Sequence, residues 1–247
     1  MANRFHRAGA ERARGVRDLF AAVAPRYDLI NDLQSLGLHR RWKKLMVRQA
    51  APRPGQHALD LCCGTGDIAF ALAAAGARVT GVDFSEPMLA VARRRATRLE
   101  RAHGPRPRLP EFLQGDALAL PFPDATFDIV TIAYGLRNLA DIHAGLSEMA
   151  RVTRPGGRLV VLDFGRPPNR LWRTLYFLHL RTIVPLLGRI FCGDPETHGY
   201  ILESLRHYPD APEIQARMEQ AGWSRVRWRR LLGGVMTLHH ATRTEAS

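Results

Sequence analysis

Residues 58–67 read Ala-Leu-Asp-Leu-Cys-Cys-Gly-Thr-Gly-Asp, the pattern of a strand that turns sharply into a helix. Gly64 and Gly66 carry no Cβ, so the backbone at these positions can approach a bound nucleotide closely. The stretch therefore predicts a Rossmann-like α/β domain with a nucleotide-like cofactor at the junction between its first strand and the following helix.

On either side of this stretch, short apolar runs alternate with amphipathic segments, as they do in βαβ units. The expected strands cover residues 57–62, 78–82, 111–114, 127–133, 157–163, 224–229 and 234–240. The expected helices cover residues 67–75, 86–102, 141–152 and 212–221. This alternation predicts a mostly parallel sheet.

The chain divides into one α/β domain and two additional segments. Residues 1–51 are expected to form an N-terminal helical lid, because apolar side chains recur at helical spacing over 16–23 and again over 27–51, where the pattern is broken near Gly37. Residues 52–247 are expected to form the cofactor-binding domain. Within it, residues 165–208 break the alternation and are interpreted as an insertion that serves the acceptor substrate.

Composition limits the class of protein. The 247 residues carry a formal charge of +13, and no run of eighteen uncharged apolar residues occurs, so we expect a cytoplasmic protein. A basic surface suits either nucleic acid or anionic lipid. Cys62, Cys63 and Cys192 match neither a disulfide framework nor a zinc spacing, and we expect no metal site.

Acidic residues around the glycine loop distinguish between two cofactors. With Ala69 the loop also fits the dinucleotide pattern Gly-x-Gly-x-x-Ala, and Asp83 follows the second strand, where a ribose-binding acid is expected. However, Asp67 in the first helical turn would repel a pyrophosphate. S-adenosylmethionine has no phosphate, and its cationic groups suit a loop flanked by Asp60 and Asp67.

A third acid follows the third strand. Asp116 can accept a hydrogen bond from adenine N6, and the amide of Ala117 can contact the ring. Taken singly, Asp67 could merely stabilise a helix terminus and Asp116 could cap a turn. Taken together, they predict a cofactor site formed by Asp60, Gly64, Gly66, Asp83, Phe84, Asp116 and Ala117, to which the resemblance described next adds Thr65.

Residues 59–67, 81–89 and 120–128 resemble class I methyltransferases in general. More specifically, 27–32, 37–43, 134–138, 154–157 and 233–239 resemble the C-methyltransferases of menaquinone and ubiquinone biosynthesis, a resemblance that runs from about residue 16 to residue 243. It implies a seven-stranded, mostly parallel sheet with helices on both faces. It also implies that Thr65, Asp83, Asp116 and Ala117 bind S-adenosylmethionine.

The resemblance further implies a prenylated quinol as acceptor. Ubiquinone-type members have a serine where this chain has Ala133, which favours demethylmenaquinol, a naphthoquinol. A ubiquinone-pathway benzoquinol stays an alternative. So does demethylphylloquinol, because residues 33–39 and the Cys-Cys-Gly loop are also similar to the phylloquinone enzymes.

Methylation of a quinol carbon requires loss of a hydroxyl proton, and three residues are candidates for assisting it. Arg137 could stabilise the phenolate, Asn138 could orient the hydroxyl, and Tyr27 could close over the site. His198 is a weaker candidate for the base. Alternatively, Arg137 and Asn138 anchor a loop and Tyr27 belongs to the core.

The apolar, aromatic stretch 171–191 contains three arginines, which predicts an interfacial or lid helix at a membrane surface rather than a span. Packing on the sheet with a homodimer contact is the alternative. An RNA methyltransferase is disfavoured because no Asn/Asp-Pro-Pro-Tyr/Phe block occurs, so no nucleic-acid partner is expected. A cofactor-binding module without catalysis would not need the apolar insertion.

Overall fold

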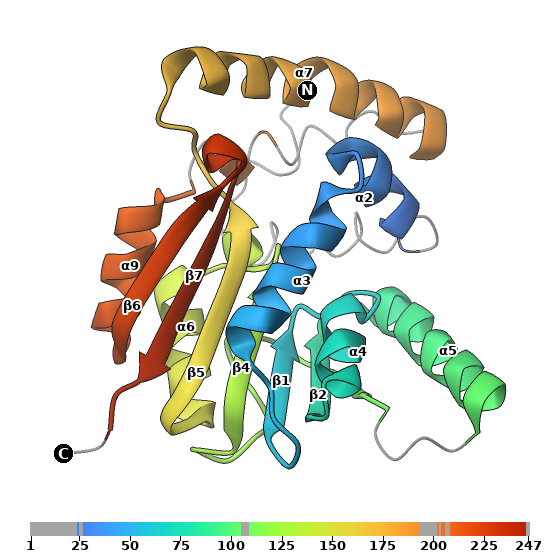
Figure 1. The fold of residues 1–247 in the computed structure, drawn as a ribbon, viewed down its shortest axis with the longest axis vertical. Helices are drawn as coiled ribbons and strands as arrows, with labels where there is room; N and C mark the ends of the chain where they lie inside the picture. Colours follow the sequence, from blue (N-terminus) through green and yellow to red (C-terminus); the bar gives the residue numbers. More distant parts are fainter. Residues whose placement is uncertain are drawn as a thin grey trace.

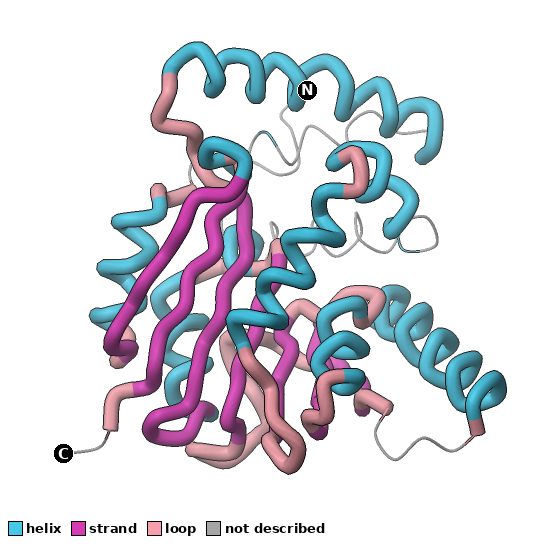
Figure 2. Tube along the Cα trace, viewed as in Figure 1, coloured by secondary structure: helices cyan, strands magenta, loops and turns pink. Residues whose placement is uncertain are grey.

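The computed structural model describes residues 24, 27–104, 109–192, 202, 204–205 and 208–245. The helix expected near residues 16–23 and the candidate base His198 lie outside these ranges. Seven strands form one sheet, coloured magenta in Figure 2. They are β1 (His57–Leu61), β2 (Arg78–Asp83), β3 (Glu111–Gln114), β4 (Phe127–Ala133), β5 (Thr153–Phe164), β6 (Trp223–Leu231) and β7 (Met236–Arg243).

The strand order is β3-β2-β1-β4-β5-β7-β6. Strands β1 to β5 pair in parallel, whereas β7 runs antiparallel to both β5 and β6. The order reverses between β1 and β4, and ligands of open α/β sheets bind at the carboxyl ends of the strands at such a switch point. The expected seven-stranded, mostly parallel sheet is confirmed.

Helices cover both faces of the sheet, as Figure 1 shows for most of them. They are α2 (Tyr27–Ser35), α3 (Leu38–Ala50), α4 (Asp67–Ala74), α5 (Glu86–His103), α6 (Ile142–Val152), α7 (Arg170–Cys192) and α9 (Ala211–Gln220). Apolar residues of α3, α4 and α5 form one core with the sheet, and those of α6 and α9 form another. Alternate strand residues such as Ala58 and Leu59 enter opposite cores, because side chains along a strand alternate between faces.

The two segments outside the βα rhythm meet at the carboxyl ends of the strands. Helices α2 and α3 are separated at Gly37, whose φ of 74° is the left-handed conformation that glycine favours. Helix α7 lies across the end of the sheet beside α2, with which it is in contact (Figure 1). Within the described ranges, no helix is both long and apolar enough to cross a membrane.

Five strands differ in their bounds from the sequence-based prediction, and the largest difference is at the start of β5. Strand β5 begins at Thr153 rather than at residue 157, because Thr153 pairs with Phe127 before the register shifts and Arg158 pairs with Ile129. The intervening residues 154–157 therefore form an irregularity within the strand rather than a connection that precedes it.

Candidate active site

A cavity of about 150 Å³ lies at the carboxyl ends of β1, β2, β3 and β4. It is lined by Cys62, Val82, Asp83, Phe84, Gly115, Asp116, Ala117, Leu118, Asn138, Leu139 and Ala140. Four of the eight expected cofactor residues are in this wall, together with Asn138 from the expected catalytic set. We call it the cofactor cavity.

Asp83 fastens the glycine loop to the end of β2. Its Oδ2 accepts a hydrogen bond from the Gly64 amide at 2.8 Å, and its Oδ1 accepts one from the Ser85 amide at 2.9 Å. Burial raises the pKa of this carboxyl group, and the amide hydrogen bonds act against that rise. Asp83 thus fixes the loop geometry while lining the cofactor cavity.

Asp60 is a buried acid with one unsatisfied oxygen. Its Oδ1 accepts a hydrogen bond from Thr131 Oγ1 at 2.8 Å, whereas Oδ2 has no hydrogen-bond partner among the described residues. Burial raises the pKa of Asp60 to about 7. A buried carboxylate oxygen without a partner is costly, so this site suits a ligand with a cationic or hydrogen-donating group.

The two loop glycines serve different purposes. At Gly66 φ is 87°, and a Cβ would lie 2.9 Å from the rings of Phe70 and Phe112. At Gly64 φ is 55°, and a Cβ would meet nothing within 4 Å. Gly66 is therefore required by packing, whereas Gly64 faces open space where a cofactor can approach the backbone.

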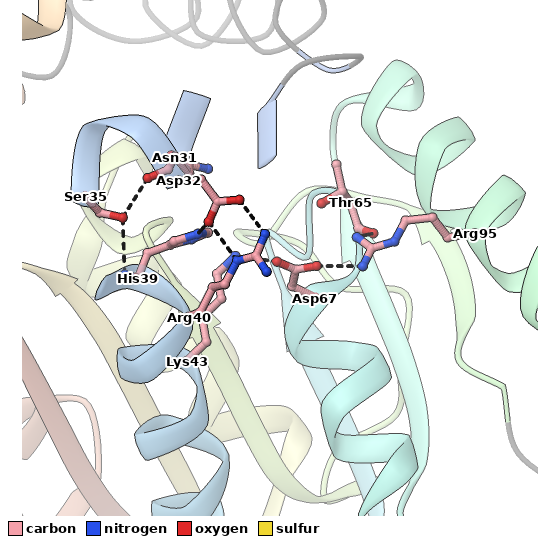
Figure 3. Close-up of polar contacts among 9 residues, drawn as sticks. All are labelled: Asn31, Asp32, Ser35, His39, Arg40, Lys43, Thr65, Asp67 and Arg95. Atoms are coloured by element: carbon pink, nitrogen blue, oxygen red, sulfur yellow. Dashed lines mark hydrogen bonds and ion pairs between the residues drawn. The ribbon is translucent and has the colours of Figure 1, made fainter. Parts of the chain in front are cut away.

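Asp67 does not offer a free charge to a cationic cofactor, and the prediction from the sequence is wrong in this detail. Asp67 Oδ2 accepts a hydrogen bond from Lys43 Nζ at 2.7 Å, and Oδ1 pairs with Arg95 Nη2 at 2.8 Å (Figure 3). Burial alone would raise the pKa of Asp67, but Lys43 and Arg95 outweigh it and lower the pKa. Its charge is therefore already balanced, which leaves Asp83 and Asp116 as the acids that line the cofactor cavity and Asp60 as a buried acid near the end of β1.

This ion-pair cluster connects three helices to the glycine loop. Lys43 comes from α3, Asp67 from α4 and Arg95 from α5. The same Arg95 donates from Nη1 to the backbone oxygen of Thr65 at 2.8 Å (Figure 3). Thr65 is 3% exposed. The cluster thus holds the loop against the helix that the sequence assigned to the lid.

A second cavity, of about 310 Å³, lies between α2, α3 and α7. Its wall is mainly apolar and aromatic; it contains Asn31, Gln34, Ser35, Leu36, Leu38, His39, Trp42, Tyr134, Phe164, Trp172, Leu175, Tyr176, His179, Leu180, Leu232 and Val235. Tyr134 belongs to this wall, and Asn138, four residues later, belongs to the wall of the cofactor cavity. We call it the acceptor cavity.

Arg137 is an anchor in the segment between the cavities, and neither set of lining residues includes it. Its side chain is 5% exposed, and its guanidinium donates to Asp163 Oδ1 at 2.7 Å and to the Tyr134 backbone oxygen at 2.6 Å. It also lies over the Phe164 ring at 4.6 Å. Direct stabilisation of a phenolate by Arg137 is thus not what this geometry favours.

The other two expected catalytic residues differ in how far the structure describes them. Asn138 Nδ2 donates to the Tyr134 backbone oxygen at 3.3 Å and lines the cofactor cavity. Tyr27 begins α2, at the acceptor side of the fold, but its side chain lies outside the described part of the structure.

Sequence reasoning missed a polar group on the wall of the acceptor cavity. His39 Nε2 lies 2.8 Å from Asp32 Oδ1, and Arg40 Nε donates to the same oxygen at 2.7 Å while its Nη2 contacts Oδ2 (Figure 3). The hydrogen bonds from Arg40 and His39 lower the pKa of Asp32 to about 2. The contact crosses the break at Gly37 between α2 and α3, so the periodicity of a single helix could not have indicated it.

Comparisons with known proteins agree with this architecture. Residues 7–243 match the model of the ubiE/COQ5 methyltransferase family. The chain belongs to that family. It is 45% identical over 228 residues to a demethylmenaquinone methyltransferase of Mycobacterium sp. (strain KMS), with 92% of this chain and 94% of the relative covered.

Two further comparisons concern a second relative and a solved structure. The chain is 44% identical to the ubiquinone/menaquinone biosynthesis C-methyltransferase UbiE of Paracoccus denitrificans, over 91% of this chain and 88% of the relative. A SAM-dependent methyltransferase of Thermotoga maritima, described as a possible histamine N-methyltransferase, has the same fold. That structure matches with a TM-score of 0.64 at 18% identity, over 92% of this chain and 99% of that one.

Family membership confirms two predictions made from the sequence. The protein is a methyltransferase, and its cofactor is S-adenosylmethionine. The site fits this cofactor, because Asp60 offers a buried oxygen without a partner among the described residues, Gly64 leaves its backbone open, and Asp83 and Asp116 line the neighbouring cavity. The resemblance to quinone C-methyltransferases is confirmed as well.

Proposed function

We propose that the protein methylates a ring carbon of demethylmenaquinol, a prenylated naphthoquinol. The observation that carries the proposal is an apolar acceptor cavity beside the cofactor cavity, with residues 134–138 contributing to both walls. A planar aromatic ring with an isoprenoid tail is the kind of molecule that such a cavity can desolvate. The names of the relatives support the same acceptor.

S-adenosylmethionine, when bound, supplies an electrophilic methyl group on a sulfonium. We assign its binding to Asp60, Gly64, Thr65, Gly66, Asp83, Phe84, Asp116 and Ala117. In this assignment Asp83 accepts from the ribose hydroxyls, Asp116 and Ala117 contact the adenine, and Asp60 Oδ2 faces the cationic part of the cofactor.

The protein's contribution to catalysis is then to orient the ring, exclude water and remove one hydroxyl proton. Asn138 orients the quinol from the cofactor side, and Tyr134 bounds the acceptor cavity. Arg137 acts as a positioning residue, because it holds the Tyr134 carbonyl and stacks on Phe164. Tyr27, at the start of α2, closes the acceptor side.

A benzoquinol of ubiquinone biosynthesis is the second candidate acceptor, since one relative's name includes both pathways. The test is transfer of label from S-adenosylmethionine to chemically reduced demethylnaphthoquinol, with a demethoxy benzoquinol and bulk RNA in parallel. Label in the naphthoquinol alone supports the proposal. Label in the benzoquinol alone assigns the protein to the second candidate, and label only in RNA refutes both.

We further propose that the mouth of the acceptor cavity rests on an anionic membrane surface. Leu36 and Leu171 are 87% and 71% exposed at this end of the fold, where Leu175, Leu178 and Leu186 are exposed as well. A neighbouring concave surface contains Arg40, Lys43, Lys44, Arg48 and Arg95 with Asp67 as its acid. Exposed leucines beside basic side chains suit acyl chains beneath anionic headgroups.

Vesicle co-sedimentation tests the membrane contact. We expect binding to phosphatidylglycerol vesicles to exceed binding to phosphatidylcholine vesicles and to weaken with salt. The double variant Leu36→Ser and Leu171→Ser should weaken it by at least about tenfold. Equal vesicle binding by the variant would refute a membrane contact at these leucines. A concentration-dependent dimer of the wild type that the variant abolishes would assign the leucines to an interface between two copies of the chain.

A further inference from the structure

His39 occupies an unusual position in the wall of the acceptor cavity. It lies in the first turn of α3 and is 4% exposed. Its Nε2 lies 2.8 Å from Asp32 Oδ1, across the break between α2 and α3 (Figure 3). Its Nδ1 is buried and has no hydrogen-bond partner among the described residues. One ring nitrogen is thus engaged and the other is available.

The carboxylate determines which nitrogen is available. Arg40 donates to both oxygens of Asp32, and these hydrogen bonds, with that of His39, lower the pKa of Asp32 to about 2. An anionic Asp32 can only accept hydrogen bonds, so Nε2 of His39 carries the proton in this contact. Neutral His39 therefore keeps its lone pair on Nδ1, the tautomer that a general base requires.

We propose that His39 is the general base that removes the hydroxyl proton of the quinol, with Asp32 as its positioning residue. This inference rests on the proposed function. Nδ1 takes the proton while the O–H electron pair stays on the oxygen and raises the electron density of the ortho carbon. That carbon forms a bond to the methyl group as the methyl–sulfur bond breaks and its electron pair remains on sulfur. The methylated carbon then loses its own proton to water, which restores the aromatic ring.

Besides Tyr134, two other ionisable side chains line this cavity, and both are weaker candidates. Burial raises the pKa of the Tyr176 hydroxyl, so Tyr176 is protonated at neutral pH and cannot accept the proton. His179 also lines the cavity from α7, but no carboxylate among the described residues bonds to it, so its tautomer is not fixed. Among the described residues, only His39 combines a cavity position with a fixed tautomer.

The test compares His39→Gln with wild type, using the quinol that the wild type methylates. We expect kcat to fall by about 100- to 1000-fold, with KM and the Kd of S-adenosylmethionine within about threefold of wild type. His143→Gln, an exposed histidine of α6, is the matched control and should keep wild-type rates. Retention of more than about a third of kcat in His39→Gln, or a loss confined to His179→Gln, refutes the assignment.

A pH profile provides a second readout that a structural role would not change. Besides Asp32 itself, the ionisable groups that border the same cavity walls as His39 are Arg40, Lys43, Lys44, Arg48, Asp67, Arg95, Tyr134, Tyr176 and His179. Asp32→Asn removes the negative charge beside the imidazolium, so the acidic limb of kcat should move to lower pH. An unmoved limb in a folded variant that binds S-adenosylmethionine refutes the proposal. A wild type that methylates no quinol refutes the proposed function instead.

Discussion

Replacing Asp60 with asparagine should stabilise the protein and weaken its cofactor site. The wild-type carboxyl is buried, has one oxygen without a partner among the described residues, and has a pKa raised to about 7. The amide introduced by Asp60→Asn would keep an oxygen able to accept from Thr131, which donates at 2.8 Å in the wild type. The variant therefore removes a buried ionisable group without removing the acceptor of that hydrogen bond.

The size of the effect follows from the pKa. The pKa of Asp60 in the folded protein, about 7, lies above the ordinary aspartate value of 3.8, so the folded protein holds the proton more tightly than the unfolded chain does. The free energy of unfolding of the wild type therefore falls as pH rises from about 3.8 to about 7. One pKa unit corresponds to about 1.4 kcal/mol. From about pH 5.5 to above pH 7, the stability gained by Asp60→Asn should therefore grow by about 2 kcal/mol.

Urea denaturation of both proteins without cofactor, at about pH 5.5 and about pH 8, measures this difference. Titration calorimetry should show that the variant binds S-adenosylmethionine at least about tenfold more weakly, because in the proposed assignment Asp60 faces the cationic part of the cofactor and its charge is lost. Thr131→Val is the control, since it removes the hydrogen bond but keeps the acid. A stability difference that does not change between the two pH values refutes the reasoning.

Three further predictions concern packing and positioning. Gly66→Ala should cost about 2 to 4 kcal/mol in urea denaturation, because its Cβ would meet two phenyl rings at a positive φ; a loss under about 0.5 kcal/mol contradicts this. Arg137→Met should lower the free energy of unfolding by about 3 to 5 kcal/mol, because it leaves the buried Asp163 without its ion-pair partner. Adding Asp163→Asn to that variant should recover much of the loss. If it recovers nothing, the loss does not come from the ion pair. Arg95→Gln should weaken S-adenosylmethionine binding about tenfold in calorimetry, because the Thr65 carbonyl loses its hydrogen bond from Arg95. An unchanged affinity would show that the glycine loop keeps its conformation without Arg95.

The fold was largely predictable because each strand and helix carries a local signal. The apolar run at β1, the glycines after it and the largely apolar helix-forming segment of α4 all indicate the same strand–turn–helix unit. The start of β5 was harder to predict from the sequence, because its first residue pairs with β4 before a register shift that depends on that partner strand. Pairing between distant strands is not encoded in local periodicity.

The site was predictable only in part. Acids that follow strands, such as Asp83 and Asp116, reach one crevice because parallel strands end at the same edge of the sheet. The partners of Asp67 were not predictable in the same way, since Lys43 lies 24 residues earlier in a helix whose docking depends on tertiary packing. The position of Arg137 relative to Asp163, 26 residues later, is of the same kind.

The segment that joins the two cavities is fixed by hydrogen bonds to the backbone of Tyr134, two of which come from the side chains of Arg137 and Asn138. Tyr134 has a φ of 59°, its amide donates to the Leu162 oxygen at 2.7 Å, and its carbonyl accepts from both Arg137 and Asn138. Methyl transfer is sensitive to the alignment of donor and acceptor atoms, so a rigid wall lowers the entropy that must be lost in the reaction. A buried Arg137 that lines neither cavity can therefore matter to the rate of methyl transfer.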